Sequence, residues 1–550
     1  MNRLLLLLLV IFIFAVGCGK PPGKKALPEK ITLPEKNSAP SPCYGDTLVN
    51  SYVADIIALN PLITNDGVSF QFYDLLFNGL LKYDENYNLV PDLAETWEIS
   101  ADGLAITFKL RKDVLWHDGV SFTSTDVLFT FEKMIDPATG CPSRDNYTSF
   151  STLEIPDDYT VRFRLKELFA PALEYCGFYV IPRHIYQNEN IKTSKYNLNP
   201  VGTGAFKFTQ WLPAEQIVLD ANQKFYDGRP YFNKYICRII PDSSMTFLSF
   251  KRGDIDCISL TKDQYSKQVD ESFRAKYNLY KISKAYVYMP YNVQKPFLSE
   301  LPVRKALGMA IDREELIKDV LHGFGKLISG PFTPGSWPDN PEVLPQPFDP
   351  TGAVELLKSA GFTDSDGDEY LERDGKKLSV RITNFGQDAA SLVLPNLIRD
   401  FWKKIGVASE LVCMNWDALM NDVNSGKFDA VLFGGSYGGW DPDGIYGSWH
   451  SSQFPDPTGT GSGFNYNRFS NSEMDSLLEQ GRRTYDHEAR RKIYYRIHAL
   501  LNEQQPCTYI YSVDQIYAVD KRIYGISVTP VSELNSILHW YVPEGLQKYQ

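Results

Sequence analysis

Two aspartates that stand one residue apart, Asp441 and Asp443, lie in a glycine-rich stretch at 433–444 that reads FGGSYGGWDPDG. Carboxylates at this spacing can serve as an acid/base pair in glycoside hydrolysis, ligate a cation or form a turn. Tyr437 and Trp440 add aromatic faces, and the glycines leave the backbone free to bend. The stretch is therefore a candidate for catalysis, for metal binding or for the wall of a ligand cleft.

The surroundings of the two aspartates disfavour phosphate, calcium and hydrolytic chemistry. A phosphate loop needs GxxxxGK[ST], or GxGxxG leading into a helix, and neither pattern is present. A calcium loop needs three or more well-spaced oxygen side chains, and two aspartates are too few. Nothing else in the sequence supports a glycosidase pair. Turn formation by the aspartates remains the main alternative to ligand binding, and we predict no catalytic residue.

A second acidic run, DSDGD at 364–368, resembles the start of an EF-hand loop. Glu369, however, stands where that loop needs glycine, and Gly375 stands where it needs the bidentate glutamate. We therefore predict a polar turn there, and we expect no metal and no cofactor in this protein.

The segment before the glycine-rich stretch indicates the elements that position it. Leu378, Val380 and Ile382 alternate as in a strand. Helical spacing follows at 388–404, a strand pattern at 407–412, helical spacing at 415–424 and a strand pattern at 428–433. This βαβαβ order predicts a partly parallel sheet with crossover helices. The stretch then lies beyond the carboxyl end of a strand, where ligands bind in open α/β sheets.

Three more helices and the size of the chain complete the picture of a globular protein. Capping patterns predict helices that begin at Thr123, Asp312 and Asp486. A chain of 550 residues is too long for one hydrophobic core, so we expect two or three lobes. The net charge of -11 argues against a nucleic-acid surface, which would need a basic stripe.

The first residues indicate export. A basic start, an apolar run at 4–14 and small residues before Cys18 are typical of a cleaved signal peptide, since the run is too short to span a bilayer. AVGC at 15–18 resembles the lipobox of bacterial lipoproteins, in which Cys18 would receive the lipid. The alternative is cleavage elsewhere. A proline-rich tether follows to residue 43. Of the seven later cysteines some can pair in this compartment, but their odd number leaves at least one without a partner in the chain.

Several sequence blocks occur in the order seen in one known family. They are LAETWE at 93–98, DG at 102–103, ITFKLR at 106–111, WHDG at 116–119, TSTDV at 123–127, VGTGAF at 201–206, VRKAL at 303–307, AIDR at 310–313, GFNY at 463–466 and SN at 470–471. Together they cover about 47–511. In them the chain resembles the bacterial extracellular solute-binding proteins of family 5, the peptide- and nickel-binding lipoproteins that feed ABC importers.

The resemblance implies an α/β fold of the two-lobe periplasmic-binding-protein type (type II, cluster C-like) with an extra inserted domain. It places a signal peptide at 1–17 and the lipidated Cys18 with its tether at 18–43. The first lobe comprises 44–75, 202–285 and 505–550, the inserted domain 76–201 and the second lobe 286–504. The two lobes would close on a ligand around a hinge.

The resemblance also implies where a ligand would lie. The glycine-rich stretch becomes the second-lobe wall of the cleft, and the expected contacts are Gly435, Tyr437, Trp440, Asp441, Asp443, Trp416, Asn292 and Asn384. Dipeptide binders of the family carry an aspartate a few residues before their DPD-like segment and an arginine after the first strand of this lobe. Here the matching positions hold 436–439 (SYGG) and 384–387 (NFGQ), so a short peptide held by both charged ends is disfavoured.

The expected function is therefore that of a binding protein. We expect a monomeric, lipid-anchored, non-enzymatic receptor outside the cytoplasm, in the periplasm or at the cell surface, which captures a peptide and delivers it to the permease subunits of an ABC importer. Longer peptides, held through their backbone, need terminal anchors less. The alternatives are a non-peptide solute, such as a sugar or a nickel complex, a secreted hydrolase, or a sensor or adhesion lipoprotein on the same fold.

Overall fold

The structure is a computed structural model that describes residues 40–64, 66–85, 88–386, 391–436, 441–456, 463–529, 534 and 536–549, the Lys284 side chain excepted. Cys18 and most of the tether lie outside the described residues, as do Tyr437 and Trp440. All elements named below belong to one unit, Pro42–Gln550. Within the described part of the chain, none of the helices has both the length and the apolar character that a membrane crossing requires.

The first lobe contains a sheet of four strands in the order β1, β10, β9 and β8. Their bounds are Thr47–Tyr52, Lys234–Ile239, Gln216–Ala221 and Phe206–Leu212. β1 is parallel to β10, and the other two pairs are antiparallel. Helix α1 (Gly67–Leu76) buries Phe72, Leu75 and Leu76 in the same core as this sheet. The sheet thus takes its strands from both sides of segment 76–201.

Segment 76–201 carries an antiparallel sheet of its own, in the order β4, β5, β7 and β6. These strands are Ala94–Ile99, Ala105–Leu110, Thr160–Leu165 and Phe150–Asp157. Helix α2 (Ser124–Ile135) begins at Thr123 as predicted, because the Thr123 amide donates to the Asp126 carboxylate at 3.0 Å. The shorter elements are β2 (Leu81–Tyr83), β3 (Leu89–Pro91), η1 (Arg144–Tyr147), α3 (Ala172–Tyr175), α4 (Arg183–Tyr186) and η2 (Lys195–Asn197).

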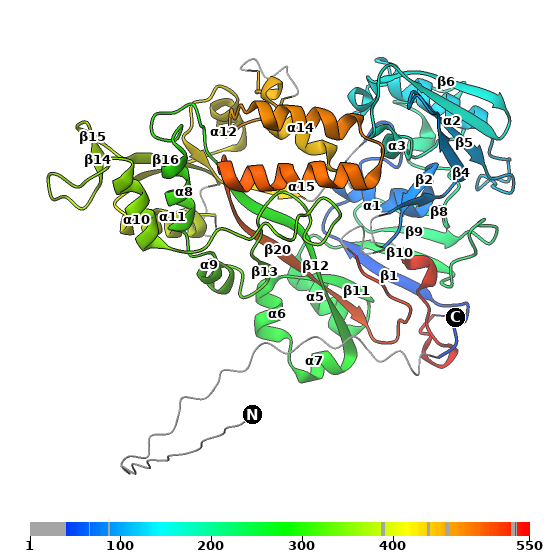
Figure 1. Cartoon of the computed structure of the whole chain (residues 1–550). Helices are drawn as coiled ribbons and strands as arrows, with labels where there is room; N and C mark the ends of the chain where they lie inside the picture. Colours follow the sequence, from blue (N-terminus) through cyan, green and yellow to red (C-terminus); the bar gives the residue numbers. More distant parts are fainter. Residues whose placement is uncertain are drawn as a thin grey trace, which may run out of the picture. The chain divides into compact units, whose positions relative to one another are not determined.

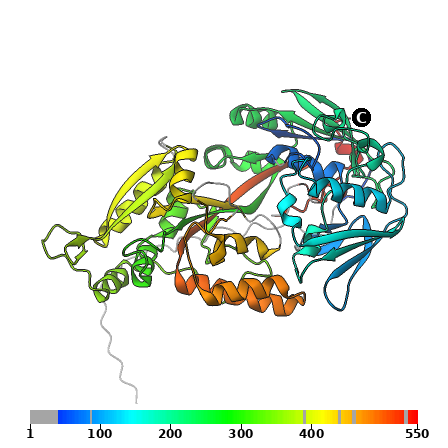
Figure 2. The ribbon, with the colours of Figure 1, turned by 90° about the horizontal axis from the view of Figure 1, so that it is seen from above.

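Two strands of 14 residues, β12 (Tyr277–Pro290) and β20 (Cys507–Asp520), run antiparallel to each other and connect the two lobes. Figure 2 shows this green and red pair passing between the blue and the yellow groups of elements. Ile282 and Tyr517 pack into the first-lobe core, whereas Met289 and Ile510 pack into the second-lobe core. β11 (Cys257–Leu260) and β13 (Gly325–Lys326) pair with β20, and β19 (Phe433–Ser436) pairs with β12. Helices α5, α6 and α7 (Ser243–Arg252, Lys262–Gln268 and Glu271–Lys276) pack beside β11.

The second lobe contains the predicted βαβαβ unit. Strands β17, β16 and β18 (Ala408–Met414, Ser379–Phe385 and Ala430–Val431) form a parallel sheet. The crossover helices are α11 (Val393–Lys404) and α12 (Trp416–Asn424). The prediction of one last strand at 428–433 was only partly right, because the chain leaves this sheet after Val431 and pairs with β12 from Phe433. The glycine-rich stretch therefore begins at the sheet that connects the lobes.

Both other predicted helices of the second lobe are confirmed. α9 (Arg313–Asp319) and α15 (His487–Gln504) begin where the carboxylates of Asp312 and Asp486 accept backbone N–H groups, from Glu315 at 2.9 Å and Ala489 at 2.8 Å. α14 (Ser472–Arg483) lies beside α15 (Figure 1). The remaining elements are α8 (Leu301–Met309), α10 (Pro350–Ser359), β14 (Glu372–Arg373), β15 (Lys376–Lys377), η3 (Pro442–Ile445), α13 (Tyr446–Trp449), η4 (Ser451–Gln453), η5 (Ile537–His539) and η6 (Glu544–Leu546).

Several cysteines serve the cores as small apolar side chains. Cys141, Cys176, Cys237 and Cys507 are buried thiols without a disulfide. Burial raises the pKa of the Cys176 thiol and raises that of Cys507 to about 12. The thiols of Cys176 and Cys507 therefore stay protonated and inert near neutral pH.

Candidate functional site

A cavity of about 480 Å³ opens at the carboxyl end of β1, where α1 and α5 begin and β11 and β20 pass. This is the position at which open α/β sheets bind ligands. Its wall includes residues from both ends of the first lobe's sequence, from Asn50 to Tyr517. The lining residues are Asn50, Ser51, Tyr52, Val53, Gly67, Val68, Gln71, Ser243, Thr246, Ile258, Ser259, Gln515 and Tyr517.

None of the described residues that line this cavity carries a formal charge at neutral pH. Side-chain amides such as Gln71 and Gln515, and hydroxyls such as Thr246 and Ser259, offer hydrogen bonds. Val53, Val68 and Ile258 offer apolar surface. A buried carboxylate or ammonium of a ligand would find no counter-charge among these described residues, so the cavity suits an uncharged portion of an organic molecule.

The second lobe presents aromatic side chains at the carboxyl ends of its strands. Trp416, the first residue of α12, is 51% exposed, and Phe385, the last residue of β16, is 53% exposed. Their rings meet edge-on with centroids 5.8 Å apart. Trp416 also lies 6.3 Å from the ring of Phe433, which begins β19. Large exposed aromatic surface at this edge of a sheet is available to bind a ligand.

Gly435 is required by packing within the connecting sheet. It lies in β19 opposite Tyr286 of β12. A Cβ atom at this position would lie 2.3 Å from the Cζ atom of the Tyr286 ring. The glycine therefore allows the Tyr286 ring to pack over the strand, and this packing requires glycine whether or not a ligand also contacts it.

The two aspartates that opened the sequence analysis are both bound to arginines of the α14–α15 pair. Asp443 accepts two bonds from Arg482, at 2.8 and 3.1 Å, and Asp441 accepts two from Arg490. Asp441 also accepts the Asp443 amide at 2.8 Å, which starts η3. Burial raises the pKa of the Asp443 carboxyl, and Arg482 opposes that shift. The expected turn is thus present, and its charges are compensated within the protein.

The two predicted asparagines hold backbone segments of the second lobe. Asn292 is 2% exposed and its side-chain amide donates to the carbonyls of Gly426 and Phe428, at 3.1 and 3.3 Å. Asn384, at 7% exposure, donates to the carbonyls of Phe385 and Ser391. Each amide therefore shapes the loop beside a strand end. Ligand contacts by these asparagines, by Gly435, Trp416, Asp441 and Asp443, and by Tyr437 and Trp440 outside the described residues, stay predictions.

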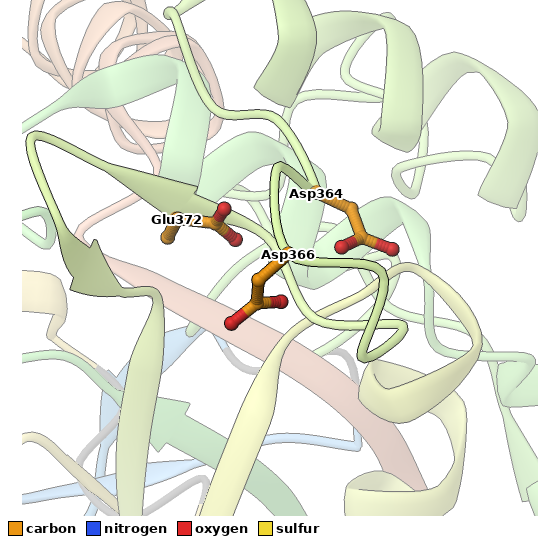
Figure 3. A group of neighbouring side chains, drawn as sticks. All are labelled: Asp364, Asp366 and Glu372. Carbon is orange, nitrogen blue, oxygen red and sulfur yellow. The ribbon is translucent and has the colours of Figure 1, made fainter.

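The acidic run at 364–368 forms a polar turn, as predicted. The carboxylates of Asp364, Asp366 and Glu372 lie around one bend, with one oxygen of each within 4.8 Å of the others (Figure 3). Backbone amides are their partners: Gly367 donates to Asp364 at 2.7 Å and Ser365 donates to Glu372 at 2.6 Å. The two aspartates are exposed. Acidic side chains that accept nearby backbone amides in this way stabilise a surface turn.

The expectation that the sequence holds no G-x-S-x-G pattern of a nucleophile elbow is wrong, because residues 434–438, GGSYG, match it. In the structure Ser436 pairs with Ala285 in an antiparallel ladder at the edge of the connecting sheet. A nucleophile elbow follows a strand of an α/β-hydrolase sheet and turns sharply into a helix. The sheet of Ser436 is antiparallel here, and residues 437–440, which follow it, lie outside the described residues.

The sequence analysis missed the cavity of the first lobe entirely. Its residues are common polar and aliphatic types without a motif, and they come from five segments that only the fold brings together. The usable signal was local: a strand pattern at 47–52, followed by Asp66, whose carboxylate caps α1 by accepting the amides of Val68 and Ser69. A strand that leads to a capped helix predicts a binding edge.

Comparison with known proteins agrees with this architecture. The family of bacterial extracellular solute-binding proteins, family 5, matches residues 88–456. The oligopeptide-binding protein AppA of Bacillus subtilis is 30% identical over 98% of this chain and 97% of its own length. The solved structure of that protein in complex with a nonapeptide covers 92% of this chain and 100% of its own, at 28% identity and a TM-score of 0.71. NikZ from Campylobacter jejuni, solved in complex with Ni(L-His), covers 90% of this chain and 99% of its own, at 30% identity and a TM-score of 0.72.

Two α/β lobes joined by paired strands define a type II periplasmic binding protein. The chain belongs to family 5 of the bacterial extracellular solute-binding proteins.

Proposed function

We propose that the protein is the lipid-anchored substrate-binding protein of an ABC importer, which captures peptides between its lobes and delivers them to a membrane permease. The cavity at β1 would be the first-lobe wall of the cleft. Trp416, Phe385 and the glycine-rich stretch would be its second-lobe wall. Residues 44–75, 202–285 and 505–550 would move as one lobe and 286–504 as the other, with β12 and β20 as the hinge.

The observation that carries the peptide assignment is the uncharged lining of the cavity. Amide and hydroxyl groups match the N–H and C=O groups of a peptide backbone, and the aliphatic and aromatic surfaces accept apolar side chains. A short peptide would bring its charged ends into this lining without partners. A longer peptide can leave its termini outside, and the relative AppA was solved with a nonapeptide.

Asp441 and Asp443 support a receptor rather than a hydrolase. Each carboxylate is engaged by an arginine through both of its oxygens. A general base must be able to accept a proton from substrate or water, and both oxygens of each of these carboxylates are already engaged by a guanidinium. Their arrangement suits a rigid wall.

A nickel complex is the second candidate, because NikZ was solved with Ni(L-His) at similar identity. The described lining has no imidazole, thiolate or carboxylate that could ligate nickel directly. Such a solute would therefore have to bring most of its own ligands. This candidate is separated from the first by identifying the bound solute.

The test is native mass spectrometry of the mature domain purified without Cys18, followed by mild denaturation to release what co-purifies. A ladder of peptides with varied sequences is the expected result. A single sugar or a metal complex would overturn the peptide assignment and leave the solute-receptor assignment intact. A variant in which Gln515 is changed to Glu should lose the peptides, because it places an unpaired carboxylate in the lining.

A further inference from the structure

The inserted domain and the first lobe share one hydrophobic core. Leu75 and Leu76 of α1 belong to the same buried cluster as Ile106, Phe108 and Phe163 of the inserted sheet. Polar contacts add to this union: the His117 amide donates to the Gly202 carbonyl at 2.8 Å, and the Gly202 amide donates to His117 Nδ1 at 3.1 Å. The two therefore move together as one body.

The second lobe has separate cores, which the two long strands connect to the first body. One of these cores packs around the sheet β17-β16-β18, and another packs around α14 and α15. Any contact between 76–201 and the second lobe is therefore a second bridge between the two bodies, remote from the hinge strands. Such a bridge has to break when the lobes separate.

This second bridge lies at the turn between α14 and α15, which meets the segment before α3 (Figure 1). The Tyr485 hydroxyl lies 3.1 Å from the carbonyl oxygens of both Gly103 and Phe169, which share its one proton. The Ala170 amide donates to the Arg482 carbonyl at 2.6 Å. The Arg482 guanidinium also lies over the Phe169 ring, 5.1 Å from its centroid. A few hydrogen bonds and one stacked cation are weak enough to form and break reversibly.

The same arginine reaches the candidate ligand wall. Arg482 binds Asp443 at 2.8 and 3.1 Å and lies 3.8 Å from the centroid of the Tyr446 ring. Asp443 is 5% exposed and stands at the end of the glycine-rich stretch. One residue therefore holds the second-lobe wall with its side chain and the inserted domain with its carbonyl.

We propose that Arg482 and Tyr485 form a clasp that fastens the inserted domain to the second lobe when the cleft is closed. They are positioning residues, because they raise the affinity for the solute without touching it. The clasp stabilises only the closed state. Its loss therefore shifts the population toward open molecules, and the affinity for the solute falls as the closed fraction falls. The inference needs opening and closing, but it does not depend on the solute being a peptide.

The test uses ligand-free mature protein, obtained by unfolding, dialysis and refolding, and the variant Tyr485→Phe. This change removes the hydroxyl that reaches Gly103 and Phe169 and keeps the ring. We expect exchange of the Ala170 amide with deuterium to become about five- to tenfold faster, since about 1 kcal/mol per lost hydrogen bond corresponds to that factor. The radius of gyration from small-angle X-ray scattering should increase as well.

Tyr495→Phe is the matched control, because Tyr495 lies on α15, the helix that follows Tyr485, and its ring is contacted by Arg491 of α15. It should leave both readouts unchanged. Arg482→Lys, which keeps a charge for Asp443 and loses the planar stack on Phe169, should act in the direction of Tyr485→Phe. Unchanged exchange at Ala170 in both clasp variants, or an equal effect of the control, would overturn the clasp. A failure to bind peptides would affect only the proposed function.

Discussion

Arg490 holds Asp441 with both ends of its guanidinium: Nη2 lies 2.7 Å from Oδ1, and Nη1 contacts Oδ2. The two side chains are only 8% and 14% exposed. The pair joins the start of η3 to the first turns of α15, two segments that are 49 residues apart. It fixes the end of the glycine-rich stretch to the helical part of the second lobe.

Asp441→Asn should destabilise the protein by about 3 kcal/mol, because it leaves the buried Arg490 without a counter-charge. Urea denaturation of the mature domain measures this loss. Asp400→Asn is the control: Asp400 faces Arg399 at the surface, with 60% and 43% of their side chains exposed, and should change stability by less than about 1 kcal/mol. Normal stability with lost solute binding would instead place Asp441 in contact with the solute.

Arg522→Met should cost about 3–5 kcal/mol, since it leaves the carboxylates of Asp46 and Asp256 buried without their guanidinium. Both carboxylates are fully buried, and Arg522 Nη2 lies 2.6 Å from Asp256. Arg252→Met removes a comparable side chain from an exposed pair with Asp254 and should have little effect. Thermal unfolding of both variants and the wild type measures this difference in stability. Equal midpoint temperatures for Arg522→Met and Arg252→Met would contradict the prediction.

His498 should make the protein sensitive to mild acid. It is fully buried, and burial lowers its pKa to about 4 from the ordinary 6.5. Between pH 6.5 and pH 4 the His498 imidazole is protonated in the unfolded chain but not in the folded protein, so stability falls as the pH drops through this range. The loss amounts to about 3 kcal/mol for this group. The difference between the free energies of unfolding at pH 7 and pH 4.5, measured by denaturation, should be smaller in His498→Asn than in the wild type. His487→Asn changes an exposed histidine and should keep the wild-type difference.

Much of the fold follows from local patterns. Alternation at Leu378, Val380 and Ile382 identified β16 because one face of each strand is buried. Asp312 and Asp486 identified helix starts because a carboxylate at that position satisfies free amides. The end of the unit was misplaced because β19 changes sheets, and the partner that captures it, β12, is distant in sequence.

The site was predicted less well, for physical reasons. The roles of Asp441 and Asp443 depend on Arg482 and Arg490, about 40 to 50 residues later, and an aspartate that meets a ligand looks the same in sequence as one that meets an arginine. The cavity of the first lobe depends on side chains without any motif, such as Thr246 and Gln515. Ligand walls of this kind are defined by where neutral groups converge, and only the fold determines that.

Cys18→Ala should release the protein from the membrane, because the variant lacks the thiol that would carry the lipid. Fractionation of cells that produce either form, followed by detection of the protein in the soluble and membrane fractions, measures this. The variant's solute should be unchanged in native mass spectrometry, since Cys18 lies ahead of the tether. Continued membrane association of the variant would contradict the lipid anchor.

Trp416→Ala should weaken solute binding by about tenfold, or about 1.4 kcal/mol, while stability changes by less than about 1 kcal/mol. The ring is half exposed and packs edge-on against Phe385, so its removal destabilises the folded protein only slightly. The same change removes an aromatic face from the proposed cleft wall. Isothermal titration with the solute released from the wild type measures the affinity. Phe348→Ala is the matched control, because that ring is 48% exposed and contacts Phe401 of α11. An equal loss of affinity in the two variants would show that Trp416 acts only through general stability, and would remove it from the proposed cleft wall.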